Sequence, residues 1–145
     1  MGGQPENADR PQRGSGGSSP LTPEVAGLLA HARAKLKAAR ILLAASAPGD
    51  AASRAYYAAF HAVSAALLAH GHAYSSHAQV LGAFNRDFVR AGAFPREFTS
   101  TLTRLFEDRQ TGDYDPTTSL DPAEAERDVQ DAERIVEAVA AHLAT

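Results

Sequence analysis

The 145-residue sequence predicts one all-α domain, an antiparallel up-and-down bundle of about five helices, three of them long. Alanine is very abundant, and glycine and proline stand mostly outside the periodic segments, a composition that favours helices. Apolar residues recur at helical spacing in five separate stretches. No stretch carries a strand signal, and no internal repeat is visible in the sequence.

The first two helices have recognisable ends. Thr22 is a good N-cap with Pro23 at the first helical position, so we expect a helix to begin there and to end near Ala47. Asp50 can cap a second helix, which continues to Gly71, a natural C-terminal stop.

The remaining helices follow at short intervals. Ser75 or Ser76 can cap a third helix, whose large apolar residues keep a 3.6-residue period until just before Gly92. A fourth helix is expected to begin at Pro95 and to end at Gly112.

The last helix has the clearest start signal. Asp121 with Glu124 forms a capping box, and Pro122 stands at the first helical position. The apolar side of this helix consists of Ala125, Val129, Ala132, Ile135, Val136, Val139 and Leu143.

Residues 1–20 differ in composition from the rest of the chain. They are rich in Gly, Ser, Pro, Gln and Asn and contain no periodic apolar residues, so they cannot bury enough surface to offset the entropy of ordering. We therefore expect a disordered N-terminal tail at 1–20 and a helical domain at 21–145.

Charge is distributed unevenly. Residues 21–112 carry ten Lys and Arg against six Asp and Glu, whereas residues 113–145 carry two Arg against nine acids. The middle could meet a polyanion and the C-terminal segment could not. The excess is weak for a dedicated nucleic-acid binder, and ordinary solvated helix faces explain most of these charges equally well.

Composition also excludes several classes of protein. The sequence has no cysteine, so it offers no disulfide, thiolate nucleophile or cysteine-based zinc site. It shows no apolar signal segment at the N-terminus and no run of 18 apolar residues. We expect a protein that neither spans a membrane nor is exported, and a cytoplasmic location follows by elimination.

The second helix has two unusual faces. Tyr56, Ala59, Phe60, Val63 and Leu67 fall on one side and predict a packing face. Arg54 and His61 fall together on the opposite side, because seven residues are close to two helical turns. Small residues at 58 and 65 lie along that nearly uncharged side, which we expect to let a partner helix come close.

Arg54 and His61 are the candidate catalytic pair. A guanidinium is a permanent cation suited to phosphate, and an imidazole can act as general acid or base near neutral pH. Such a pair suits cleavage of RNA, whose 2′-hydroxyl can be the nucleophile, without a metal or other cofactor. The alternative is that Arg54 sits in a buried ion pair and His61 is a satisfied core histidine.

Three segments resemble the HEPN domain family. Ser53–His61 (SRAYYAAFH), followed by small residues and leucines, resembles its signature helix, whose general motif is R-x(4–6)-H. Ser76–Val80 (SHAQV), before an aromatic helix, resembles the second block of an uncharacterised HEPN subset. Arg109–Tyr114 (RQTGDY) resembles the third block, Arg-x-x-Ala-Asp-Tyr. An acidic last helix is also typical, and the resemblance covers about residues 24–143.

The resemblance implies an antiparallel bundle that dimerises through the motif helices. In active members the Arg and His of both subunits line one cleft and cleave RNA without metal. Many are toxins encoded beside a minimal nucleotidyltransferase antitoxin, and others are inactive modules thought to bind nucleotides or other ligands. For this chain it implies a homodimer through the helix that carries Arg54 and His61.

Two positions depart from the family pattern. Ala55 directly follows the motif arginine, where many active members have a polar residue that orients the catalytic pair. Val63 stands where the toxins silenced by nucleotidylation carry the modified tyrosine. Tyr56, Tyr57 or Tyr114 would have to substitute for it, or that control is absent.

Other polar residues are expected to support the cleft or to bind a ligand: Tyr57, His77, Arg109, Asp113 and Tyr114. Asp113 could pair with Arg54 or with Arg109, and a buried pair with Arg54 would weaken the case for phosphate binding. His70, His72 and His77 match no standard metal-ligand spacing, so we expect no metal site. Ser53 has no plausible base beside it, so we do not expect it to be a nucleophile.

Three functions remain open from the sequence. The first is a metal-independent endoribonuclease of toxin–antitoxin type. The second is a non-catalytic module that binds a nucleotide or small ligand in the same cleft. The third is a helical subunit that mainly binds a nucleotidyltransferase partner. Fold resemblance alone does not choose among them.

Overall fold

The computed structural model describes residues 21–114 and 119–144, and all regular structure within them is helical. In chain order the elements are α1 Pro23–Ala44, α2 Pro48–Ala69, α3 His77–Phe84, the π-helical turn η1 Asn85–Val89, α4 Glu97–Tyr114 and α5 Pro122–Leu143. The predicted all-α bundle of five helices is confirmed. The tail predicted at residues 1–20 lies outside the described residues. None of the described helices is long and apolar enough to cross a bilayer.

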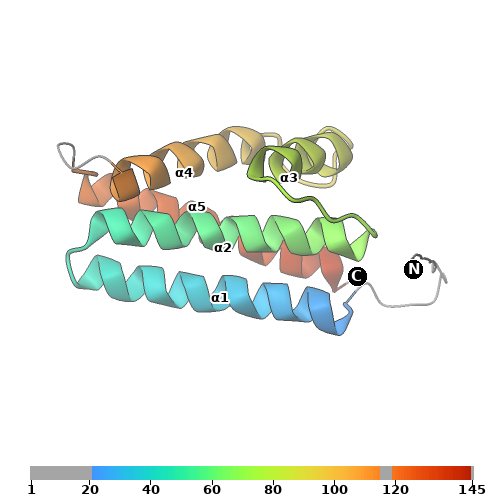
Figure 1. The fold of residues 1–145 in the computed structure, drawn as a ribbon, viewed down its shortest axis with the longest axis horizontal. Helices are drawn as coiled ribbons and strands as arrows, with labels where there is room; N and C mark the ends of the chain where they lie inside the picture. The colour runs from blue at the N-terminus through green and yellow to red at the C-terminus, as the bar shows by residue number, and fades with distance from the viewer. Residues whose placement is uncertain (1–20, 115–118, 145) are drawn as a thin grey trace.

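Helix α2 is the central element of the bundle. It packs against α1, α3, α4 and α5, and Figure 1 shows α1 along one side, α3 and α4 along the other, and α5 behind. Eleven of its 22 residues are buried, and most of these are alanines. Small side chains let the neighbouring helices approach closely, so the abundant alanine is what permits one helix to contact four others.

Side-chain caps define three of the helix starts as predicted. Thr22 Oγ1 accepts a hydrogen bond from the Val25 amide at 3.2 Å, and Ser76 Oγ accepts one from the Gln79 amide at 3.1 Å. Asp121 and Glu124 form the reciprocal capping box at the start of α5. Each bond satisfies a backbone N–H that would otherwise have no partner inside the helix.

Other predicted boundaries were wrong. Helix α2 begins at Pro48 without a side-chain cap, so Asp50 lies in its first turn instead of before it. Helix α1 ends at Ala44. The third helix gives way to η1 after Phe84. Helix α4 begins at Glu97 and continues past position 112 to residue 114.

Gly112 serves close packing and not helix termination. A Cβ placed there would lie 2.6 Å from the carbonyl oxygen of Gly49 and 2.9 Å from its Cα. Real Cβ atoms essentially never approach backbone atoms this closely, so the end of α4 and the start of α2 can cross here only because residue 112 is glycine. A Cβ on Gly49 would lie 3.2 Å from the Gly112 Cα, which is a tight contact.

Replacing Gly112 with alanine is therefore expected to separate α2 from α4. The cost should be about 1–3 kcal/mol of unfolding free energy, the usual range for overpacking. Urea denaturation of the two proteins would measure it. Gly82→Ala is the matched control, because a Cβ at this α3 position meets nothing within 4 Å. Equal destabilisation by both substitutions would contradict the close-packing explanation.

The uneven charge along the sequence is partly neutralised between α1 and α5. Arg40 of α1 binds Glu126 and Glu133 of α5 at 2.6 and 2.7 Å, and Arg33 binds Glu137 at 3.2 Å. The acidic last helix thus has a structural partner in the basic first helix. These pairs are largely exposed, so each adds little stability and mainly fixes how the helices face each other.

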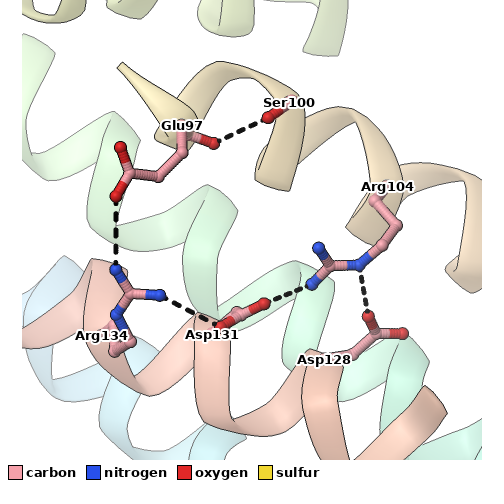
Figure 2. A network of polar contacts seen from close by, with 6 residues as sticks. All are labelled: Glu97, Ser100, Arg104, Asp128, Asp131 and Arg134. Carbon is pink, nitrogen blue, oxygen red and sulfur yellow. Dashed lines mark hydrogen bonds and ion pairs between the residues drawn. The ribbon is translucent and has the colours of Figure 1, made fainter. Parts of the chain in front are cut away.

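A second polar network joins α4 to α5 (Figure 2). Arg104 of α4 reaches Asp128 at 3.1 Å and Asp131 at 2.6 Å, and Arg134 continues the chain from Asp131 to Glu97. Asp128 is fully buried. Burial, together with the neighbouring Asp108, raises the pKa of Asp128 well above its usual range, whereas Arg104 acts in the opposite direction.

Candidate functional site

One side of α2 is not covered by another of the described helices, and it faces the viewer in Figure 1. We call this side the open face of α2. Its residues are exposed or half-buried and recur at helical spacing: Ser53, Arg54, Tyr57, Phe60, His61, Ser64 and Leu68. Arg54 is the sole charged side chain among these seven residues. The two-faced pattern predicted for this helix is present for Tyr56, Ala59, Val63 and Leu67, which are buried on the other side. Phe60, which was predicted to lie on that packing side, is instead half-buried on the open face.

The predicted role of the small residues on this helix was also wrong. Ala58 and Ala65 were expected to admit a partner helix, but both are completely buried within the chain. Helix α1 lies along this side of α2, as the contact between His31 and His61 shows. The surface left for a partner is shifted toward Tyr57 and Ser64, which stay half-buried.

Arg54 is exposed near the start of the open face. The sequence left open whether Asp113 pairs with Arg54 or with Arg109, and the structure pairs it with Arg109 at 3.2 Å. Within residues 21–114 and 119–144, Arg54 makes no hydrogen bond or ion pair. Its guanidinium is therefore available to an external anion such as a phosphate.

His61 is half-buried and lies beside α1. Its ring centroid is 4.7 Å from that of His31 and 6.4 Å from that of Tyr57. Burial, and then the nearby His31 and Lys35, lower the pKa of His61. The imidazole is therefore neutral at neutral pH and able to accept a proton.

Four of the five expected supporting residues meet between α2, α3 and α4. Tyr57 accepts a hydrogen bond from Nη2 of Arg109 at 2.7 Å, and the guanidinium lies 5.1 Å from the Tyr57 ring centroid. Asp113 Oδ2 binds Arg109 and accepts a second bond, at 3.2 Å, from the hydroxyl of Ser53. Ser53 thus acts as a link between α2 and α4.

His77 completes this cluster from the start of α3. Its ring stacks on Phe60 at a centroid distance of 4.3 Å. Burial raises the pKa of Tyr56 to about 12, and the Tyr56 hydroxyl forms a hydrogen bond with Nδ1 of His77 at 2.7 Å. Burial and Arg109 lower the pKa of His77. His77 therefore supports the open face and is committed to Tyr56.

The remaining predicted positions are accounted for as follows. Tyr114 ends α4, but its side chain lies outside the described part of the structure. Ala55 and Val63, the two departures from the family pattern, are fully buried and offer no group to the open face. His70 packs against Phe88 at 4.9 Å and His72 against Tyr74 at 6.3 Å, so these histidines lie in separate aromatic surroundings.

His31 is the residue that sequence reasoning missed. It is an exposed residue of α1. Its position beside His61 depends on how α1 packs on α2, thirty residues away in the chain. No local signal in the sequence could have shown it.

An all-helical up-and-down bundle with an Arg-x6-His pair on the open face of its central helix defines a recognisable class. The family model of the HEPN domain matches residues 25–142. The chain therefore belongs to the HEPN domain family.

Known relatives agree with this assignment. A UPF0332 protein of Thermotoga maritima is 39% identical over 109 residues, which cover 75% of this chain and 83% of that protein. A Methanocaldococcus jannaschii protein named "Putative toxin MJ0605" is 33% identical over 116 residues, 80% of this chain and 86% of its own length. The crystal structure of TT1696 from Thermus thermophilus has the same fold, with a TM-score of 0.69 and 21% identity over 81% of this chain and 97% of its own.

Proposed function

We propose that this protein is a metal-independent endoribonuclease of toxin type that acts as a homodimer through the open face of α2. The observation that carries the proposal is that Arg54, without a partner among the described residues, shares this face with a neutral His61. The toxin name of a relative that is 33% identical supports the same class of activity.

The chemistry follows from the two side chains. His61 would take the proton from a ribose 2′-hydroxyl, whose oxygen then attacks the adjacent phosphorus. The bond from phosphorus to the 5′-oxygen breaks, which leaves a 2′,3′-cyclic phosphate on one fragment and a 5′-hydroxyl on the other. Arg54 would stabilise the charge that develops on the phosphoryl oxygens.

A two-fold dimer would bring the pair together better than one chain does. Within one chain Arg54 and His61 are separated by a rise of ~10 Å along α2. If two α2 helices cross antiparallel near Tyr57, Arg54 of each subunit stands opposite His61 of its partner. The open face is half-buried and mostly uncharged, so it can meet its own copy without burying like charges against each other.

A protein partner belongs to the same proposal. A toxin needs control, and the family implies a minimal nucleotidyltransferase as the antitoxin. Co-expression with such a protein should therefore yield a stable complex that cleaves RNA more slowly than the free dimer does.

The proposal is tested by incubating the purified protein with single-stranded RNA in excess EDTA. We expect cleavage with cyclic phosphate ends, and an Arg54→Ala variant should cleave at least ~100-fold more slowly, because the transition-state charge loses its main partner. Lys37→Ala, a change at an exposed lysine of α1, is the matched control. Intact RNA together with a thermal shift on adding a nucleotide would contradict catalysis and favour the ligand-binding module.

A further inference from the structure

A polar groove lies between the end of η1 and the start of α4. It has a volume of about 440 Å³ and is lined by Asn85, Val89, Arg90, Arg96 and Thr99. None of these residues belongs to α2, and Figure 1 shows the start of α4 at the opposite end of the bundle from the start of α2. The groove is therefore distinct from the open face of α2.

Two backbone features bring both arginines to this groove. In η1 the Arg90 amide donates to the Asn85 carbonyl, five residues back, at 2.8 Å, and this wider turn places Arg90 on the same side as Asn85. Gly92 then adopts a φ of 88°, a conformation that residues with a side chain rarely take, and the chain reverses there. Arg96 thereby returns to the groove that Arg90 also lines.

The positive charge of the groove is not neutralised by its neighbours. Both arginines are exposed, and neither makes a hydrogen bond or ion pair within residues 21–114 and 119–144. The acids nearest to them in the chain have other partners. Asp87 of η1 pairs with Arg86 at 2.8 Å, and Glu97, the first residue of α4, pairs with Arg134 at 3.7 Å.

An asparagine adds a further donor to the groove. The Oδ1 atom of Asn85 accepts a hydrogen bond from the Thr99 hydroxyl at 2.6 Å, which fixes the amide group and leaves its Nδ2 to donate elsewhere. The groove thus presents two guanidinium groups and an amide N–H. Phosphate oxygens are negatively charged acceptors, and the planar donor fork of arginine matches their geometry.

We infer that this groove binds the backbone phosphates of single-stranded RNA outside the cleavage site, and the choice of RNA rests on the proposed ribonuclease function. Val89 is the one large apolar residue of the lining, and it is buried. The groove therefore lacks both the apolar anchors of a typical protein interface and an aromatic platform on which bases could stack. Contacts to phosphate alone make this binding independent of base sequence.

The binding is tested with a labelled 2′-O-methyl RNA oligonucleotide, which lacks the nucleophilic hydroxyl and therefore stays intact. Fluorescence anisotropy measures its affinity over a range of salt concentrations for the wild-type protein and for Arg90→Gln/Arg96→Gln. Each phosphate contact to a single strand contributes about 0.7 to the slope of log affinity against log salt. We expect the double variant to have a slope smaller by about 1.4 and to bind at least ~10-fold more weakly at low salt.

Lys37→Gln/Arg127→Gln is the matched control, because it removes two exposed positive charges from α1 and α5. This control should keep nearly the wild-type affinity and slope. An equal loss in both double variants would show that net charge alone matters and would overturn the role of the groove.

Cleavage of ordinary RNA separates this inference from the proposed function. The groove variant should have a higher KM and an unchanged kcat, because its contact is the same in the ground state and the transition state. A wild-type slope in the groove variant would overturn the inference and leave the nuclease untouched. A protein that shows the expected slope difference but cuts no RNA would support the groove and overturn the proposed function. Unchanged RNA binding, with loss of the complex formed on co-expression with a nucleotidyltransferase, would assign the groove to a protein partner and overturn the inference.

Discussion

Replacing His61 with alanine is expected to lower RNA cleavage in EDTA by about 10²–10⁴-fold, the usual contribution of a general base. Since burial, His31 and Lys35 lower the pKa of His61, the acid limb of the wild-type profile should fall below pH ~6.5, the ordinary histidine value.

His72→Ala is the matched control for that experiment. His72 is also exposed and follows the end of α2, but it is not on the open face. Cleavage by this variant should equal that of the wild-type protein. If His61→Ala retained wild-type activity, His61 would be excluded as a catalytic group.

Replacing Asp128 with asparagine is expected to change the pH dependence of stability. Burial, and then Asp108, raise the pKa of this carboxyl in the folded protein, so folding is favoured by the protonated form. The contribution of this group to wild-type stability is complete below the carboxyl pKa of the unfolded chain, about 4. This contribution is lost as the pH rises through the raised pKa of Asp128 in the folded protein.

Asparagine has nearly the same shape, can still accept from Arg104 and does not titrate. The unfolding free energy of the variant minus that of the wild type should therefore increase from pH 5 to pH 9. We expect a relative gain of more than about 1.4 kcal/mol, the equivalent of one pKa unit. Urea titrations at both pH values would measure it. Asp131→Asn, which changes a less buried partner of the same arginine, is the control. Parallel curves for wild type and Asp128→Asn would contradict the shift.

Much of the fold could be predicted because its signals are local. Caps at Thr22, Ser76 and Asp121 depend on side chains within three residues of the amides they bind, and apolar spacing sets which helix side is buried. The π-turn after Phe84 and the continuation of α4 past Gly112 depend on packing. Sequence spacing alone does not contain that information.

The site was predicted in part. The family blocks predicted Tyr57, His77, Arg109 and Asp113, and the structure joins them through a hydrogen bond, an ion pair and a ring contact. The helical wheel correctly placed Arg54 and His61 on one side of α2. It could not show where the neighbouring helices pack. It therefore predicted that Ala58 and Ala65 are free to meet a partner helix, although both are buried within the chain. It missed the contact between His31 and His61 for the same reason.

The central claim is that Arg54 and His61 act together across a dimer interface. It is tested most directly by co-expressing the Arg54→Ala and His61→Ala variants and measuring RNA cleavage by the mixed protein. A mixed dimer would contain one site with Arg54 from one subunit and His61 from the other. Random pairing makes half of the dimers mixed, so the account predicts recovery to about one quarter of wild-type activity. Cleavage no faster than that of either variant alone would contradict it.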